Sequence, residues 1–329
     1  MTHQAKLTSS EIGTLWMTYQ QKTMFLRIME FFLEHAEREE EKQLLQYVYD
    51  VISPFPDRIA QFFTDEDGKA PIGFTSEDVS VGTPKLYDNG YDIMFIRVMK
   101  QISMGMHTLH LSMSYREDVC SLYRELTSIT QEIYSKCTAY LIDNGQIARA
   151  PYVPMPKANY FVDDKKYLKG QSLLGDKRML NTVELAHIYQ GVESNTVGFI
   201  MIKSFHQVAK TDDIKKYFAE GMDLARDIIV KFTKEIEDSQ LPAPTASGGN
   251  ITNSVISPFS EKLMMYCTSL FSSFSLGKNA IGTAFSFRND LPVEVTLIAK
   301  DIFDYAHSGA RIMIKHGWLE EPPRIKDLH

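Results

Sequence analysis

The sequence predicts an all-α protein built from two tandem four-helix bundles. Apolar residues recur at helical spacing over long segments, and no segment shows sustained period-two alternation. The chain also repeats itself at a constant offset. The identical pairs are Leu7/Leu180, Glu11/Glu184, Phe32/Phe205, Ala36/Ala209, Lys42/Lys215, Asp50/Asp223 and Pro71/Pro244. Features that both halves share are expected to serve the fold, and features of one half alone are candidates for function.

The first helix is predicted over about Thr8–Ala36, where apolar residues recur at steps of three and four. Thr8-x-x-Glu11 has the pattern of a capping box, in which each residue's side chain bonds the other's backbone N–H. Asn181-x-x-Glu184 occupies the same place in the second half. The sequence therefore predicts the same kind of helix start twice.

The second helix is predicted over about residues 44–63 in the first half. Pro54 and Pro56 are expected to kink or interrupt it, because proline lacks a backbone N–H donor. Its counterpart, at about Thr211–Ser239, contains no proline and is expected to be continuous.

Long loops follow, at about residues 65–81 and 240–253. Their length suits a crossover that runs along a bundle from the second helix to the third. Thr83-Pro84 and Ser257-Pro258 have the pattern of a cap and first-turn proline for the third helix. Gly105 and Gly277 fall on its apolar stripe, which predicts a close approach of helices there.

The fourth helix is expected to open after Asp118 or Asp290 and to end at Asn144-Gly145 or His316-Gly317, as left-handed C-caps. The halves are therefore predicted as bundles at residues 1–149 and 179–329, joined by a proline-containing linker at 150–178. The linker contains the apolar residues Tyr160, Phe161, Tyr167 and Leu168. A linker this apolar is expected to pack on a bundle surface.

Composition narrows the function classes. The net charge is −7 and no basic run could follow a phosphate backbone, so we expect no nucleic-acid partner. Met1–Gln4 does not begin a signal peptide, and no apolar run approaches the ~20 residues of a membrane span, so we expect no membrane insertion. Cys120, Cys137 and Cys267 are scattered and odd in number, which favours a reducing, cytoplasmic setting.

Three stretches carry a family resemblance: Leu7–Trp16 (LTSSEIGTLW), Pro258–Met265 (PFSEKLMM) and Gly309–Pro323 (GARIMIKHGWLEEPP). They resemble an uncharacterised domain-of-unknown-function family of tandem ferritin-like bundles from endospore-forming bacteria, distantly similar to spore coat protein F. The resemblance covers nearly the whole chain and implies a ferritin-like fold and a spore association. The resemblance does not imply any enzymatic reaction.

A ferritin-like dimetal site takes Glu from two helices and Glu-x-x-His from the other two. The first half has Glu132-x-x-Ser135 instead, and we interpret its His35, His107 and His110 as solvated or interface histidines. The second half has the pairs Glu184-x-x-His187 and Asp304-x-x-His307. If the first and fourth helices of the second half are antiparallel, these two pairs lie at a similar level along the bundle axis.

Two imidazoles and two carboxylates could hold iron, manganese or zinc. Three observations favour a polar surface instead: Glu184 is also a predicted capping residue, both histidines lie off the apolar stripes, and Arg226 puts a cation on the second helix.

Glu193 marks a second candidate at mid-height, with Asp301, Asp223 and Asp227 as carboxylates for a hard cation. A buried polar network with Lys203 or Arg226 is the alternative. Arg116 and Arg288 recur in both halves before the fourth helix, and we interpret each as a brace on a neighbouring carbonyl or carboxylate.

No P-loop, glycine-rich nucleotide loop or nucleophile–histidine–acid set is present in the sequence. The sequence therefore favours a non-enzymatic helical-bundle interaction protein with a protein partner or a second copy, coat-related by its resemblance. The alternative is a metal-binding ferritin-like protein or dimetal oxidoreductase that uses the second bundle. A third class, an apolar-ligand carrier, requires a long closed cavity between the helices.

Overall fold

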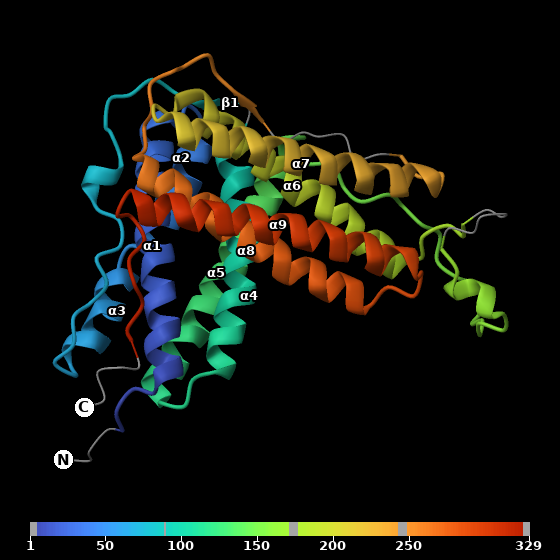
Figure 1. Ribbon diagram of the computed structural model, residues 1–329, viewed down its shortest axis with the longest axis horizontal. Helices are drawn as coiled ribbons and strands as arrows, with labels where there is room; N and C mark the ends of the chain where they lie inside the picture. Colours follow the sequence, from blue (N-terminus) through green and yellow to red (C-terminus); the bar gives the residue numbers. More distant parts are fainter. Residues whose placement is uncertain (1–4, 89, 171–176, 243–248, 325–329) are drawn as a thin grey trace. The chain divides into compact units, whose positions relative to one another are not determined.

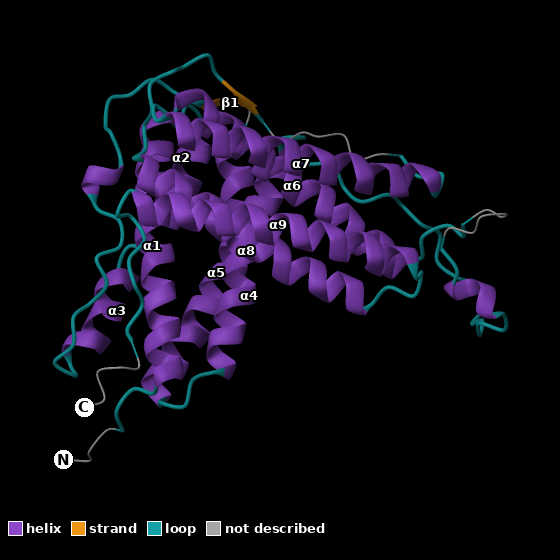
Figure 2. Ribbon diagram, in the orientation of Figure 1, coloured by secondary structure: helices purple, strands orange, loops and turns teal. Residues whose placement is uncertain are grey.

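The computed structural model describes residues 5–88, 90–170, 177–242 and 249–324. The predicted Met1–Gln4 terminus and the repeated Pro244 lie outside these residues. The fold is all-α, as predicted, and strand within the described ranges is limited to two residues each in β1 (Tyr87–Asp88) and β2 (Asn250–Ile251) (Figure 2). None of the described helices combines the length and the hydropathy of a membrane span.

The helices follow the same order in both halves (Figure 1). The first half contains α1 (Ser9–His35), α2 (Glu39–Ile52), α3 (Phe55–Thr64), α4 (Tyr91–Ser112) and α5 (Glu117–Asp143). The second half contains α6 (Thr182–Val208), α7 (Asp212–Asp238), α8 (Glu261–Ala284) and α9 (Asp290–Lys315). The short 3₁₀ helices are η1 (Ser76–Asp78) and η2 (Lys165–Leu168). Helices α1 and α6 are both 27 residues long.

Most of the predicted helix ends are confirmed. Thr8 and Asn181 each form a complete capping box with the glutamate three residues later. The chain turns into the left-handed region at Gly145 (φ +63°) and Gly317 (φ +70°), where glycine avoids a steric penalty. Pro54 lies between α2 and α3 as the N-cap residue of α3, whereas α7 is continuous.

The predicted start of the third helix is wrong in both halves. Helix α4 begins after Gly90, whose left-handed backbone (φ 75°) turns the chain into the helix. Thr83-Pro84 instead precede an extended stretch in which Lys85 pairs with Glu37. In the second half, Ser260 caps α8 by accepting a hydrogen bond from the Leu263 N–H (3.1 Å), so Ser257-Pro258 lie before the helix.

The chain forms two compact units that are not identical to the sequence halves. Unit 1 comprises Met1–Asn144, Thr252–Cys267 and Met313–His329, and unit 2 comprises Gly145–Ile251 and Thr268–Ile312. The division passes through α8 and α9. The predicted boundaries at residues 149 and 179 were placed by the sequence repeat, whereas the two units are defined by compactness. These boundaries therefore stay a prediction.

Each unit has its own apolar core. In unit 1, α1, α3 and α5 bury Leu15, Phe55, Ile59, Phe63, Val119, Leu122, Tyr123 and Leu126. In unit 2, α6, α7 and α9 bury Leu185, Ile188, Tyr189, Val192, Ile228, Phe232, Ile236, Leu291, Ile298 and Ile302. Burial of such side chains contributes about 1.5–3 kcal/mol each and is the main stabilising term of both units.

Close helix approach in unit 2 occurs at glycines other than the predicted ones. A Cβ atom at Gly191 of α6 would lie 2.6 Å from the Phe232 ring of α7. Gly277 has no atom within 4 Å of its would-be Cβ, and Gly105 is exposed. The prediction of helix contact at Gly105 and Gly277 is therefore wrong.

The expected packing of the linker is confirmed at its end and wrong in its middle. Tyr167 is half-buried, its hydroxyl accepts a hydrogen bond from Asn181 Nδ2 (3.1 Å), and the Arg178 guanidinium lies over its ring. Tyr160 and Phe161 are 84% and 97% exposed, so the bundle surfaces do not cover them. Between α5 and η2 the chain forms no regular secondary structure.

The two kinds of glycine give a matched pair of substitutions. Gly191→Ala forces the Phe232 ring to move, and we expect it to destabilise unit 2 by about 1–3 kcal/mol. Gly277→Ala enters open space inside α8 and is expected to stabilise by up to ~1 kcal/mol through helix propensity. Urea unfolding of both variants checks this, and equal effects of the same sign would contradict it.

Candidate functional site

Glu184, a predicted metal ligand, is a structural acceptor in unit 2. Its fully buried carboxylate pairs with Arg178 (2.7 Å) and accepts the backbone N–H of Arg288 (3.0 Å). The N–H groups of Asn181 and Phe287 also donate to it. Burial alone would raise the pKa of Glu184, but the hydrogen bonds from Arg178 and the backbone outweigh it and lower the pKa to about 2. The carboxylate is therefore charged and already engaged on both oxygens.

Arg288 completes this arrangement and confirms the predicted brace. Its fully buried guanidinium donates to Asp290 (2.8 Å), to Glu235 and to the carbonyl oxygen of Arg178 (3.2 Å). We call Glu184, Arg288 and their partners Arg178, Glu235 and Asp290 the unit 2 clamp. It ties the start of α6 to the start of α9.

Unit 1 contains the same arrangement. Glu11 accepts the N–H groups of Tyr115 (2.8 Å) and Arg116 (2.7 Å), and Arg116 pairs with Glu66 (2.6 Å) and Asp118 (2.8 Å). We call these residues the unit 1 clamp. Because both halves carry the clamp, it belongs to the fold rather than to a function of one half.

The other predicted metal ligands are separated. His187 is half-buried and its ring lies parallel to Phe285. Asp304 is exposed and pairs with Lys300 (2.7 Å), and His307 is exposed beside Phe303. Among the described residues, no group of three or more His, Cys, Asp and Glu side chains is arranged to hold a metal ion.

The carboxylates predicted around Glu193 also have other neighbours. Asp223 pairs with Arg226 at the surface (3.0 Å), and Asp301 is exposed. Glu193 is half-buried, and its charge acts on Lys278 of α8, a residue that the sequence analysis did not single out.

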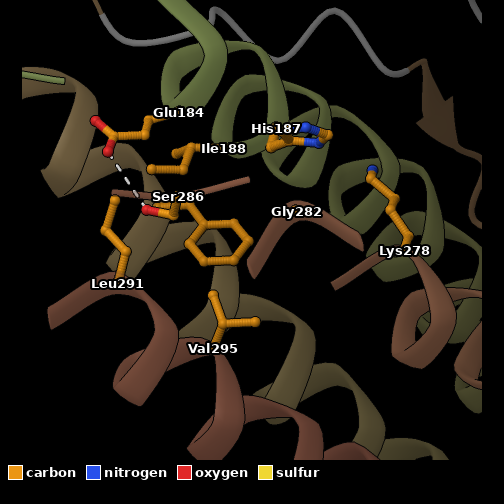
Figure 3. A pocket seen from close by; sticks show the side chains of 9 residues that line it. Glu184, His187, Ile188, Lys278, Gly282, Ser286, Leu291 and Val295 are labelled. Atoms are coloured by element: carbon orange, nitrogen blue, oxygen red, sulfur yellow. Dashed lines mark hydrogen bonds between the residues drawn. The ribbon is translucent and has the colours of Figure 1, made fainter. Parts of the chain in front are cut away.

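Unit 2 has a small, mostly apolar pocket between α6, α7, α8 and α9 (Figure 3). It is lined by Glu184, His187, Ile188, Phe232, Lys278, Gly282, Ser286, Leu291 and Val295. Its cavity volume is about 30 Å³, which is room for a group of a few atoms. Two of the predicted residues, Glu184 and His187, therefore border a cavity, although not a metal site.

Unit 1 buries a group of bases instead. Lys22, Lys100, His107 and His110 are each at most 3% exposed, and we call them the basic cluster. Our interpretation of His107 and His110 as solvated is therefore wrong. His35 is half-buried, and its two ring nitrogens contact the carbonyl oxygens of Phe31 and Thr83.

The basic cluster forms a linked network. Lys22 Nζ lies 3.0 Å from His107 Nε2, and Lys100 Nζ lies 3.4 Å from the centre of the Phe25 ring. His110 Nδ1 lies 3.2 Å from Thr18 Oγ1. The charge of Lys22 also acts on Lys100, His107 and His110, so the four bases lie close to one another in a low-dielectric core.

Burial favours the neutral forms of these bases. Burial lowers the pKa of Lys22 to about 7. Burial, and then the neighbouring Lys22, lower the pKa of Lys100 well below its usual value and that of His110 to about 4. Within the described part of the chain, no carboxylate is among the groups that shift these pKa values.

The family described as "Protein of unknown function (DUF3231)" matches residues 1–158 and again residues 168–328. The two matches confirm the repeat that the sequence predicts. A solved structure from Bacillus halodurans, described as a "putative spore coat protein", is 14% identical, with a TM-score of 0.42. The likeness covers 46% of this chain and 98% of that one. No curated protein matches the chain.

The unit 2 clamp predicts a large effect at Glu184. Glu184→Gln leaves Arg178 without its charged partner, and we expect a loss of about 2–4 kcal/mol in unfolding free energy at pH 7. The folded pKa is depressed, so this contribution is present above pH ~4.5 and is lost as the pH falls towards 2. Urea unfolding from pH 7 to 2.5 measures it. Asp304→Asn, at an exposed ion pair, is the control and should change stability by less than ~0.5 kcal/mol.

Lys22→Met is expected to stabilise unit 1, because it removes a buried amine and keeps an unbranched apolar chain. In wild type, the unfolded state takes up the Lys22 proton near pH 10.5 and the folded state only near pH 7. The advantage of the variant should therefore grow as the pH falls from 10.5 to 7 and stay constant below. Melting temperatures at several pH values test this, and a difference independent of pH would refute it.

Proposed function

Because the chain belongs to the DUF3231 family of proteins of unknown function, its role must come from its own surfaces, and we propose that it is a non-enzymatic interaction protein. We propose further that it associates with a second copy of itself through the linker segment of residues 151–162. A coat-related role, in which copies pack against one another, is consistent with such association. The ferritin-like arrangement of its bundles remains part of this proposal.

The exposed apolar side chains of the linker segment carry the proposal. Tyr152, Met155, Tyr160 and Phe161 are each more than 80% exposed, and Val162 is 62% exposed. A run of large apolar side chains this dense is characteristic of an interaction site, since exposure to water costs about 25 cal/mol for each Å² of apolar surface.

The backbone of the segment suits docking. Pro151, Pro154 and Pro156 restrict its conformations, so less entropy is lost when it binds. An extended, proline-containing segment of this kind fits an apolar groove by presenting side chains along its length.

Charge favours a second copy as the partner. The linker segment carries one charged residue, the basic Lys157, whereas the whole chain carries a net charge of −7. A basic, apolar segment is attracted to an acidic surface. The run Glu39–Glu41 at the start of α2 is one acidic surface that every copy carries.

The metal-binding alternative stays a prediction. Elemental analysis of the purified chain, with His187→Ala and His307→Ala, tests it. Metal retained by wild type and lost in both variants would favour the alternative over the interaction role.

Sedimentation velocity over a wide dilution series tests the proposal. We expect wild type to self-associate, and the double variant Tyr160→Ser with Phe161→Ser to weaken the association by at least about tenfold. Neither side chain contributes to a core, so circular dichroism and melting temperature should not change.

Tyr115→Ser is the matched control, because Tyr115 is 79% exposed but lies outside the linker segment. It should associate as wild type does. A wild-type chain that stays monomeric throughout, or an equal effect of the control, would contradict the proposal.

A further inference from the structure

Lys278 of α8 is one of the residues that line the unit 2 pocket, and its amine points toward α6 (Figure 3). Its Nζ donates to the carbonyl oxygen of Gln190 (2.7 Å) and to Ser194 Oγ (2.6 Å). Ser194 donates its own proton to the Gln190 carbonyl oxygen (2.8 Å), so its oxygen is an acceptor for Lys278. Two fixed acceptors therefore take two N–H groups of the amine.

This geometry is compatible with the neutral amine. A neutral amine has two N–H groups and one lone pair, and the two acceptors leave the lone pair unused. Burial lowers the pKa of Lys278 to about 7, although the neighbouring Glu193 acts in the opposite direction. Near neutral pH a large fraction of Lys278 is therefore uncharged and nucleophilic.

The rest of the wall is apolar. Ile188, Phe232, Leu291 and Val295 supply aliphatic and aromatic surface, and Gly282 adds no side chain. The small volume and this lining favour a short hydrocarbon chain.

The lysine of this pocket is specific to the second half. In the register that pairs Ser103 with Ser275, Lys278 replaces Met106 and Gly282 replaces His110. The His110 imidazole fills the core of unit 1, where it is 3% exposed. In unit 2 the His187 side chain lies against Gly282 instead, 3.3 Å from the position of a would-be Cβ, and the new lysine lines the same pocket.

We propose that this pocket captures short apolar aldehydes as an imine on Lys278. The lone pair of Nζ attacks the carbonyl carbon, and a C–N bond forms while the carbonyl π bond breaks. The resulting carbinolamine loses its oxygen as water, with both amine hydrogens removed, which leaves a C=N bond. His187 lines the same pocket and is the imidazole that can carry a proton to the leaving hydroxyl.

The inference is independent of the proposed self-association. Its test treats the full chain at pH 7 with limiting propanal and cyanoborohydride, which reduces an imine to a stable propylamine. Peptide mass spectrometry then gives the labelling rate of each lysine. We expect Lys278 to be labelled at least about tenfold faster than Lys300, an exposed lysine that is almost entirely protonated at this pH.

Lys22 is the internal control for basicity. Its pKa is also about 7, but its side chain is only 1% exposed in the core of unit 1. Faster labelling of Lys278 than of Lys22 assigns the reaction to the pocket rather than to a low pKa alone. Labelling of Lys278 no faster than of Lys300 would overturn the inference on wild-type protein, without any variant.

Val295→Phe supplies a second readout, because the larger ring fills the pocket without touching the amine's two acceptors. We expect it to slow Lys278 labelling at least about fivefold and to leave Lys300 unchanged. Unchanged labelling of Lys278 in the folded variant would also overturn the inference.

Discussion

A buried glutamate at the start of the first helix organises each half of the chain. Glu11 and Glu184 complete capping boxes and also accept two backbone N–H groups from the segment before the fourth helix. One carboxylate thus satisfies donors on two helices, and unsatisfied donors there would each cost about 1–3 kcal/mol. The adjacent arginines, Arg116 and Arg288, supply positive charge beside these acids. The arrangement fixes where the first and fourth helices start relative to each other.

The clamp also explains why the two halves can differ in length by one residue and still form the same arrangement. Pro71 and Pro244 keep the spacing of the earlier pairs, whereas Ser103 and Ser275 are closer together by a single position. The deletion therefore lies in the loop and early third helix, between the clamp's two anchor points. A loop absorbs so small a change at little cost, whereas a shift within α1 or α5 would move the carboxylate away from its donors.

Features that depend on neighbouring residues could be predicted from the sequence. The capping boxes, the helix break at Pro54 and the left-handed glycines Gly145 and Gly317 follow from local backbone chemistry. The start of α4 could not be predicted this way, because the stretch before it is bonded to a residue far away in the sequence. Thr252 donates its N–H to the Leu86 carbonyl oxygen (2.9 Å) and its hydroxyl to that of Lys85 (2.6 Å). The predicted helix contacts at Gly105 and Gly277 are wrong for the same reason, because helix contact depends on tertiary packing.

The basic cluster could not be predicted from the apolar pattern, because that pattern implies a single buried face for each helix. Helix α1 instead buries polar residues on several sides, from Glu11 through Thr18 to Lys22. A lysine off the apolar stripe is then taken for a surface residue, although Lys22 is 1% exposed. An unusual density of polar residues in a central helix was the signal available in the sequence.

The two cores put different chemistry at equivalent positions. Lys22 and His110 of unit 1 correspond to Asn195 and Gly282, while Met106 corresponds to Lys278. Each unit therefore holds at least one buried amine whose pKa is lowered to about 7, but on a different helix. Such amines lower stability, and a fold built only for packing would be more stable with methionine or leucine there. The two units thus share the clamp of the fold but bury their amines at unrelated positions.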